Sequence, residues 1–329
     1  MNKLTRRSWI QAAGASAGLA AITSADSLLA AGKGKSDSLA TQLYKSLSDS
    51  QKQKLCLPVD HPKRQYISNW WYIHPEHRIP TSFAREQQEL IRKIFDSMHS
   101  PEHQDAVNNQ VLIDQYGDEK NAPSAGFFGT PEDENFEFIF TGHHVTRRCN
   151  ARYDKGQGFG GAPIFYGHYP HPVKSGKENF NEAKDHPGNP YWYQGKLFNR
   201  FVQGLDGRQR GMGLVSVEPR GEQPDLVVKI ASASEKRGLP CSELSADQKK
   251  LFLETMRGML AMFREDDVKS TIEAIRKKEI INRLQVSWYG GQYDIGSDKV
   301  WDTWQIEGPD MVWYFRGVPH IHCYFHLKA

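Results

Sequence analysis

The chain has few cysteines, little net charge and no long apolar run. Its 329 residues include 4 cysteines, which rules out the disulfide-dense scaffolds of small secreted domains. The formal net charge of +3 gives no strong attraction to nucleic acid or to an anionic membrane surface. No run approaches the roughly 18 apolar residues that a membrane-spanning helix needs, and an H-E-x-x-H motif is absent. We therefore expect no nucleic-acid partner, no membrane span in the mature protein and no zincin-type protease.

The N-terminal segment has the layout of an export signal. Arg6 and Arg7 precede a weakly apolar, Ala- and Gly-rich run, and small residues follow between Ala25 and Ala31. This pattern predicts a twin-arginine signal peptide over residues 1–31, which the translocation machinery reads and which takes no part in the fold. The mature protein is then periplasmic or secreted. Proteins that use this route fold before export, often with a metal or cofactor already inserted.

Helical and strand periodicities share the rest of the chain. Apolar residues recur at helical spacing in four segments: 36–57, 79–117, 191–205 and 245–278. The last segment opens with a capping box, Ser245 followed by Gln248. Alternating aromatic residues at 136–140 indicate a strand, and 283–327 indicates four strands joined by Gly-containing turns. The order predicts a single α+β domain over residues 36–329, with helices on one side of an antiparallel sheet that ends in a meander.

The C-terminal segment "PHIHCYFHLKA" is rich in histidine. In a strand, His320 and His322 project from the same face with Cα atoms about 6.5 Å apart, so both imidazoles can reach one ion. His326 shares that face but lies about 13 Å beyond His322, which makes it a poorer ligand. We therefore expect His320 and His322 to form the core of a metal site.

A mononuclear site needs at least a third ligand, and "TGHHVT" offers His143 and His144. These two point to opposite faces if the segment stays extended, so we expect one to be a ligand and the other to pack or orient it. Imidazoles alone suit Zn or Cu, whereas a carboxylate from Glu307, Asp302 or Asp310 would favour Fe or Mn. A histidine cluster that only forms hydrogen bonds remains the alternative to a metal.

Two further groups of residues could complete a site. "SNWWYIHPEHRIP" contains Trp70, Trp71 and Tyr72, which either line a cleft, with Arg78 binding a substrate carboxylate, or plug the sheet. Arg78 and Glu307 are the two residues that we expect to be catalytic. "YGHYPHP" adds two histidines, His168 and His171, as accessory residues of that cleft.

The cysteines leave two outcomes open. Cys149 and Cys323 each lie close in sequence to one histidine group. A disulfide between them is one expectation, and free thiols are the other.

Several motifs together resemble a known family. "FIFTGHHVT", "APIFYG", "LPCSELSADQKKLF", "VSWYGG", "WQIEGPDMVWYF" and the terminal "HIH" resemble, in order and spacing, the bacterial domain-of-unknown-function family numbered thirty-five hundred. The resemblance spans roughly residues 38–326. It implies that the "GHH" and "HIH" histidines are family positions, together with Trp288, Gly290 and Gly291 of a Trp-x-Gly-Gly turn. It implies no mechanism.

Two functional hypotheses follow from the sequence. The first is an exported enzyme that holds one transition-metal ion (Cu, Zn, Fe or Mn) and acts on a small-molecule substrate, with oxidoreductase chemistry favoured over hydrolysis because of the export route. The second is a non-catalytic periplasmic binding protein whose aromatic cleft takes a small organic ligand.

Overall fold

The computed structural model describes residues 38–115, 118–151, 162–168, 190–216, 237–277, 279–290, 301–317 and 320–328. The predicted signal over residues 1–31 lies outside these ranges, as do His171 and Gly291.

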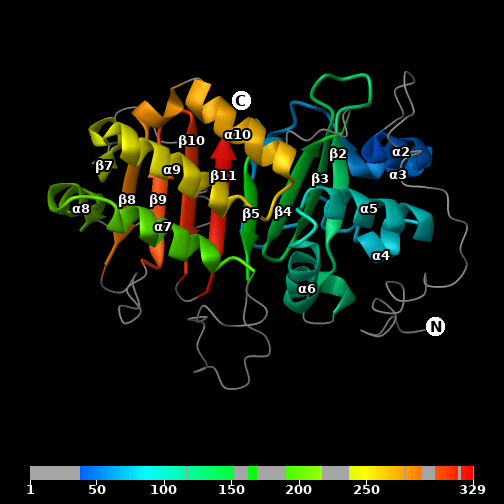
Figure 1. The fold of residues 1–329 in the computed structure, drawn as a ribbon. Helices are drawn as coiled ribbons and strands as arrows, with labels where there is room; N and C mark the ends of the chain where they lie inside the picture. The colour runs from blue at the N-terminus through cyan, green and yellow to red at the C-terminus, as the bar shows by residue number, and fades with distance from the viewer. Residues whose placement is uncertain are drawn as a thin grey trace, which may run out of the picture.

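The strands form one open, eleven-stranded sheet in the order β1-β2-β3-β4-β5-β11-β10-β9-β8-β6, with β7 paired to β8 (Figure 1). Their bounds are β1 Cys56–Leu57, β2 Ser124–Phe128, β3 Glu137–Gly142, β4 Val145–Asn150, β5 Ile164–Gly167, β6 Leu214–Val215, β7 Leu239–Pro240, β8 Gln285–Tyr289, β9 Thr303–Glu307, β10 Met311–Arg316 and β11 His322–Leu327. The pairs β1–β2 and β6–β8 are parallel, and the other pairs among the described strands are antiparallel. The predicted meander is confirmed as β8-β9-β10-β11.

One pairing decides where the histidines meet. The last strand of the meander, β11, pairs with β5, and β5 pairs with β4 of the β3–β4 hairpin. This pairing joins the meander to the N-terminal strands in a single sheet (Figure 1). The "HIH" segment at the start of β11 is therefore brought beside the "GHH" hairpin, although about 180 residues separate them in sequence.

The α-helices are α2 Leu39–Ser46, α3 Asp49–Leu55, α4 Ile79–Ser82, α5 Arg85–Ser97, α6 Gln104–Asp114, α7 Tyr193–Gln203, α8 Gly207–Gly213, α9 Ala246–Met259 and α10 Glu265–Lys277. The predicted capping box at the start of α9 is confirmed, with Ser245 and Gln248 bonding reciprocally. Within the described ranges, no helix has the length and apolarity to cross a bilayer.

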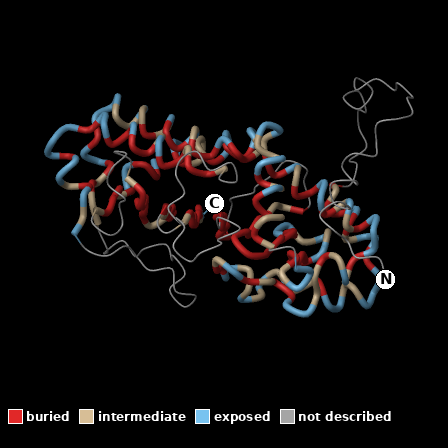
Figure 2. The backbone as a smooth tube through the Cα atoms, turned by 90° about the horizontal axis from the view of Figure 1, so that it is seen from below, coloured by how far each residue is buried: buried red, intermediate tan, exposed pale blue. Residues whose placement is uncertain are grey.

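The helices pack on one face of the sheet, as predicted. The main core unites α2, α5, α6, α7, α9 and α10 with alternate strand residues such as Phe138, Phe140 and Trp313. In one contact, the indole of Trp304 stacks between Phe198 of α7, at 4.5 Å, and Phe315 of β10, at 5.0 Å. Each such pair is worth about 0.5–1.5 kcal/mol beyond simple burial. Buried residues lie between the helices and the sheet, and exposed residues lie on the outer surfaces (Figure 2).

The opposite face of the sheet has no helical layer in the described part of the chain. Intervening strand residues contact the segment between β1 and α4 there: Ile139 packs with Trp71 and Ile73, and Tyr314 packs with Ile67. His322 lies on this face, because its neighbour Cys323 belongs to the helix-side core.

None of the four cysteines forms a disulfide, so the predicted bridge between Cys149 and Cys323 is wrong. Cys149 is on β4 and Cys323 on β11, and β5 lies between these strands. Two strand spacings of about 4.8 Å exceed the roughly 7 Å limit on the Cα separation of a disulfide.

Candidate metal centre

Three imidazoles converge where the hairpin meets the C-terminal strand. The Nε2 atoms of His320 and His322 are 2.8 Å apart, those of His322 and His144 are 3.0 Å apart, and those of His320 and His144 are 3.3 Å apart. His144 and His322 are buried, and His320 is partly buried. The three ring nitrogens thus form a compact triangle, which we call the histidine triangle.

A turn places His144 in the triangle. The β3–β4 hairpin pairs Gly142 with Val145, so His143 and His144 are its two loop residues. His144 has φ of 55°, a left-handed conformation that is uncommon for a residue with a side chain. Its backbone is held on both sides, since its N–H donates to Asn69 O at 2.8 Å and its carbonyl accepts from Gly167 N–H at 3.1 Å.

This turn overturns the expectation that the two hairpin histidines face opposite ways. That expectation required an extended segment, but the left-handed residue breaks the alternation. The rings of His143 and His144 instead stack with centroids 3.9 Å apart. His144 supplies the nitrogen of the triangle, while His143 lies against its ring.

Close backbone approach places His322. It is the first residue of β11 and pairs with Gly167 on β5 and with Arg316 on β10. A Cβ at Gly167 would lie 2.4 Å from Ile321 O and 3.3 Å from a ring carbon of His322. Only glycine therefore allows the two strands to approach without displacing the imidazole.

A buried carboxylate orients His144. The Nδ1 atom of His144 lies 3.1 Å from Oδ2 of Asp114, the last residue of α6, which is fully buried. An ionised carboxylate only accepts hydrogen bonds, so Nδ1 carries the hydrogen and Nε2 presents its lone pair to the triangle. Metal-binding histidines usually have such a partner on the second nitrogen.

His143 links the triangle to the surface. Its Nδ1–H donates to Asp114 O at 3.0 Å, and its ring packs between His144 and Trp70, whose centroid is 4.5 Å away. Trp70 is 49% exposed, and its indole N–H donates to the Tyr72 hydroxyl at 2.9 Å. A series of contacting rings therefore runs from the triangle to solvent.

Burial disfavours the charged forms of His143, His144 and His320. It lowers the pKa of His143 to about 4, and it lowers the pKa of His144 and of His320 further, with charge on the neighbouring imidazoles acting in the same direction. Buried His168, beside the end of β5, contributes to the lowering at both His144 and His320. Near pH 7, protons therefore compete weakly for the ring nitrogens.

A cation fits the triangle better than any arrangement of hydrogens. Each Nε2 atom carries either a hydrogen or a lone pair, so at least two of the three are alike. At least one pair near 3 Å then brings two hydrogens or two lone pairs together. A tetrahedral ion with nitrogen ligands at about 2.0–2.1 Å needs them about 3.3–3.4 Å apart. The longest edge of the triangle, 3.3 Å, already matches, and the shortest, 2.8 Å, needs to lengthen by about half an ångström.

The two predicted catalytic residues lie away from the triangle. The Arg78 guanidinium stacks on Tyr72 at 3.3 Å from the ring centroid and donates to Lys120 O at 3.1 Å. Glu307 is in the ladder row of Val312 and His326, about 13 Å along the strand from His322 and two strands across.

Another arginine is better placed than Arg78. Arg316 is the cross-strand partner of His322, and its charge contributes to the lowered pKa of His320. A guanidinium that faces the triangle in this way could bind an anionic group of a substrate.

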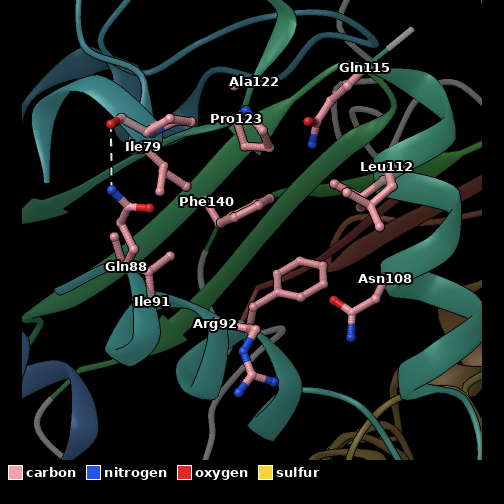
Figure 3. A pocket seen from close by; sticks show the side chains of 13 residues that line it. Ile79, Gln88, Ile91, Arg92, Asn108, Leu112, Gln115, Ala122, Pro123 and Phe140 are labelled. Atoms are coloured by element: carbon pink, nitrogen blue, oxygen red, sulfur yellow. Dashed lines mark hydrogen bonds between the residues drawn. The ribbon is translucent and has the colours of Figure 1, made fainter. Parts of the chain in front are cut away.

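The predicted aromatic cleft is only partly present. Trp71 plugs the sheet face and donates to the Thr146 hydroxyl at 2.8 Å, whereas Trp70 lies beside the histidines. A separate apolar pocket lies between α4, α5, α6 and β3, with Phe140 at its floor and Gln88 at its rim (Figure 3). Its volume of about 70 Å³ has room for about two waters, far less than a drug-sized ligand needs.

Sequence reasoning missed Asp114 and its neighbour Gln110. Both occupy the inward face of α6, where Val107 and Val111 supply the apolar residues of the same helical stripe. A carboxylate and an amide at core positions of an amphipathic helix were the available signal, because buried polar groups are kept only where they have partners.

Fold and site together define an α+β protein with a three-histidine candidate metal centre. The family model described as "Protein of unknown function (DUF3500)" matches residues 33–327, and the chain belongs to this family. No curated protein and no solved structure matches the chain. Since the family description assigns no activity, function has to be argued from the centre.

Proposed function

We propose that this protein is an exported, metal-dependent enzyme in which His144, His320 and His322 hold one transition-metal ion. The observation that carries the proposal is the convergence of three Nε2 atoms within 3.3 Å of one another. One lone pair is already oriented toward the centre by Asp114. Three protein ligands leave a coordination position open, as catalytic sites do and structural four-ligand sites do not.

The ligand set favours zinc or copper. Three neutral imidazoles suit these ions, and the carboxylate of Asp114 bonds to the far nitrogen of His144 rather than pointing into the triangle. Such an ion would supply Lewis acidity, an activated water or one-electron chemistry. The twin-arginine signal that the sequence predicts, and the exposed Trp70 packed against His143, support oxidoreductase over hydrolase chemistry.

The chain's own residues have defined parts in this proposal. Asp114 holds the tautomer of His144, and His143 packs that ring in place. Arg316, paired with His322 across the strands, supplies positive charge near the triangle for a small anionic substrate. The residues at the sheet face limit access of water to the ring nitrogens, since His144 and His322 are 1% and 2% exposed.

Elemental analysis of the exported protein tests the proposal. We expect near-stoichiometric copper or zinc in the wild type and none in a His320→Ala/His322→Ala double variant. His326→Ala is the matched control, because His326 lies on the same strand and face but outside the triangle. Equal metal content in the wild type and the double variant would overturn the assignment, and absence of metal from all three proteins would remove its main support.

A further inference from the structure

A buried chain of hydrogen bonds leads from the metal centre into the helix-side core. Asp114 Oδ2, which accepts from His144, also accepts from Gln110 Nε2 at 2.6 Å. Gln110 Oε1 in turn accepts from the Tyr191 hydroxyl at 2.7 Å. Gln110, Asp114 and Tyr191 are each fully buried.

A buried guanidinium lies beyond the last hydrogen bond of the chain. Arg147, on the helix face of β4, is 1% exposed, and its positive charge acts on the Tyr191 hydroxyl. Nη2 of Arg147 has no hydrogen-bond partner within 3.5 Å among the described residues, so the charge acts on Tyr191 without a direct hydrogen bond. Elsewhere the guanidinium is fixed, with Nε donating to His99 Nε2 at 3.0 Å and Nη1 to Phe165 O at 2.7 Å.

The hydrogen bonds of the chain all point the same way, with each donor directed toward Asp114. An ionised aspartate can only accept, so Asp114 fixes the orientation of the groups that lead to it. The Gln110 amide must turn its nitrogen to Asp114 and its oxygen to Tyr191, whose hydroxyl therefore donates. The positive charge of Arg147 favours this direction. In such an aligned chain each hydrogen bond polarises the next.

This arrangement answers an electrostatic problem. Within the described residues Arg147 forms no ion pair with a carboxylate, yet a buried charge without compensation is costly. The chain leads from that charge to the buried carboxylate of Asp114, whose Oδ2 accepts from both Gln110 and His144. We infer that Arg147, Tyr191 and Gln110 are positioning residues that act through Asp114 to fix the tautomer and orientation of His144 in the metal centre.

The metal-affinity part of this inference rests on the proposed function, but the tautomer part does not. The test uses Tyr191→Phe, which removes one hydroxyl and keeps the ring. Tyr166→Phe is the matched control, because Tyr166 is equally buried, stacks against Tyr191 at 5.0 Å and donates to Gln194 outside the chain. Gln110→Met breaks the chain at a second place and keeps the test valid if Tyr191→Phe folds poorly.

The first readout is nitrogen-15 NMR of histidine-labelled, metal-free protein, with His144 assigned from His144→Gln. In the wild type and in Tyr166→Phe we expect a single His144 tautomer with hydrogen on Nδ1, and in Tyr191→Phe and Gln110→Met a mixture that includes hydrogen on Nε2. An unchanged tautomer in both chain variants would overturn the inference.

The second readout is zinc affinity by chelator competition. We expect a loss of about 3- to 10-fold in Tyr191→Phe and Gln110→Met, below the 10- to 100-fold typical of direct partners, and none in Tyr166→Phe. A tautomer change without zinc binding by the wild type would support the chain and contradict the proposed function. Zinc binding that is equal in all variants would support the proposed function and contradict the chain.

Discussion

Replacing Asp114 with asparagine should weaken metal binding without unfolding the protein. Asparagine keeps the size of the side chain and an acceptor oxygen, but it removes the charge that strengthens the bond from His144 Nδ1 at 3.1 Å. A hydrogen bond to a charged acceptor is worth about 1.5–3 kcal/mol and a neutral one about 0.5–1.5 kcal/mol. The difference of about 1–1.5 kcal/mol corresponds to roughly a 10-fold loss of affinity.

Alanine at the same position should have a larger effect. It leaves the Gln110 amide and His144 Nδ1 without their shared acceptor, so we expect up to about a 100-fold loss of affinity. It should also destabilise the fold by about 1–3 kcal/mol for each buried donor left unsatisfied.

The assay is zinc affinity by competition with a chromophoric chelator, with urea unfolding of the metal-free protein measured alongside. Asp267→Asn is the matched control, because Asp267 is 2% exposed and its ion pair with Arg264 lies on α10, away from the triangle. If the Asp114→Asn and Asp267→Asn variants bind zinc as tightly as the wild type, Asp114 does not orient a metal ligand and the reasoning fails.

Three further predictions follow from the same geometry. Copper(II) should quench part of the tryptophan fluorescence, and Trp70→Phe should remove most of that quenching, because the indole of Trp70 packs against the ring of His143. Equal quenching in the variant would contradict this contact. Gly167→Ala should lower metal occupancy, and it should lower the free energy of unfolding by roughly 1–3 kcal/mol, because the added Cβ clashes beside His322. Elemental analysis and urea unfolding measure the two effects. Wild-type behaviour in both would show that the strands can separate freely. Burial lowers the pKa of His74 to about 4, so below pH 6.5 the unfolded state binds more protons at this residue than the folded state does. The free energy of unfolding therefore falls as the pH falls, by about 2 kcal/mol at pH 5 from this residue alone. His74→Gln should make urea unfolding less pH-dependent between pH 7 and 5.

Local signals in the sequence predicted most of the elements. The capping box of α9 and the alternation of Phe136, Phe138 and Phe140 depend on neighbouring residues only, and both are confirmed. The predicted helical segment that begins at residue 79 is divided in the structure: residues 79–82 form a separate helical turn, α4, and α5 begins at Arg85. Boundaries of this kind depend on packing that a single segment does not encode.

The strand order could not be predicted in the same way. Nothing local in β11 specifies that it pairs with β5, and this long-range pairing creates the histidine triangle. His320 and His322 could be proposed from a spacing of two in a strand. Selection of His144 over His143 depended on a left-handed backbone at a hairpin loop, which the alternation rule cannot anticipate.

Spectroscopy of the metal itself tests the central claim most directly. X-ray absorption of the zinc- or copper-loaded protein should show three imidazole nitrogens at about 2.0–2.1 Å and one light-atom ligand, and the His144→Ala variant should lose one imidazole. A first shell with sulfur, with fewer than two imidazoles, or unchanged by His144→Ala would contradict a centre built from His144, His320 and His322.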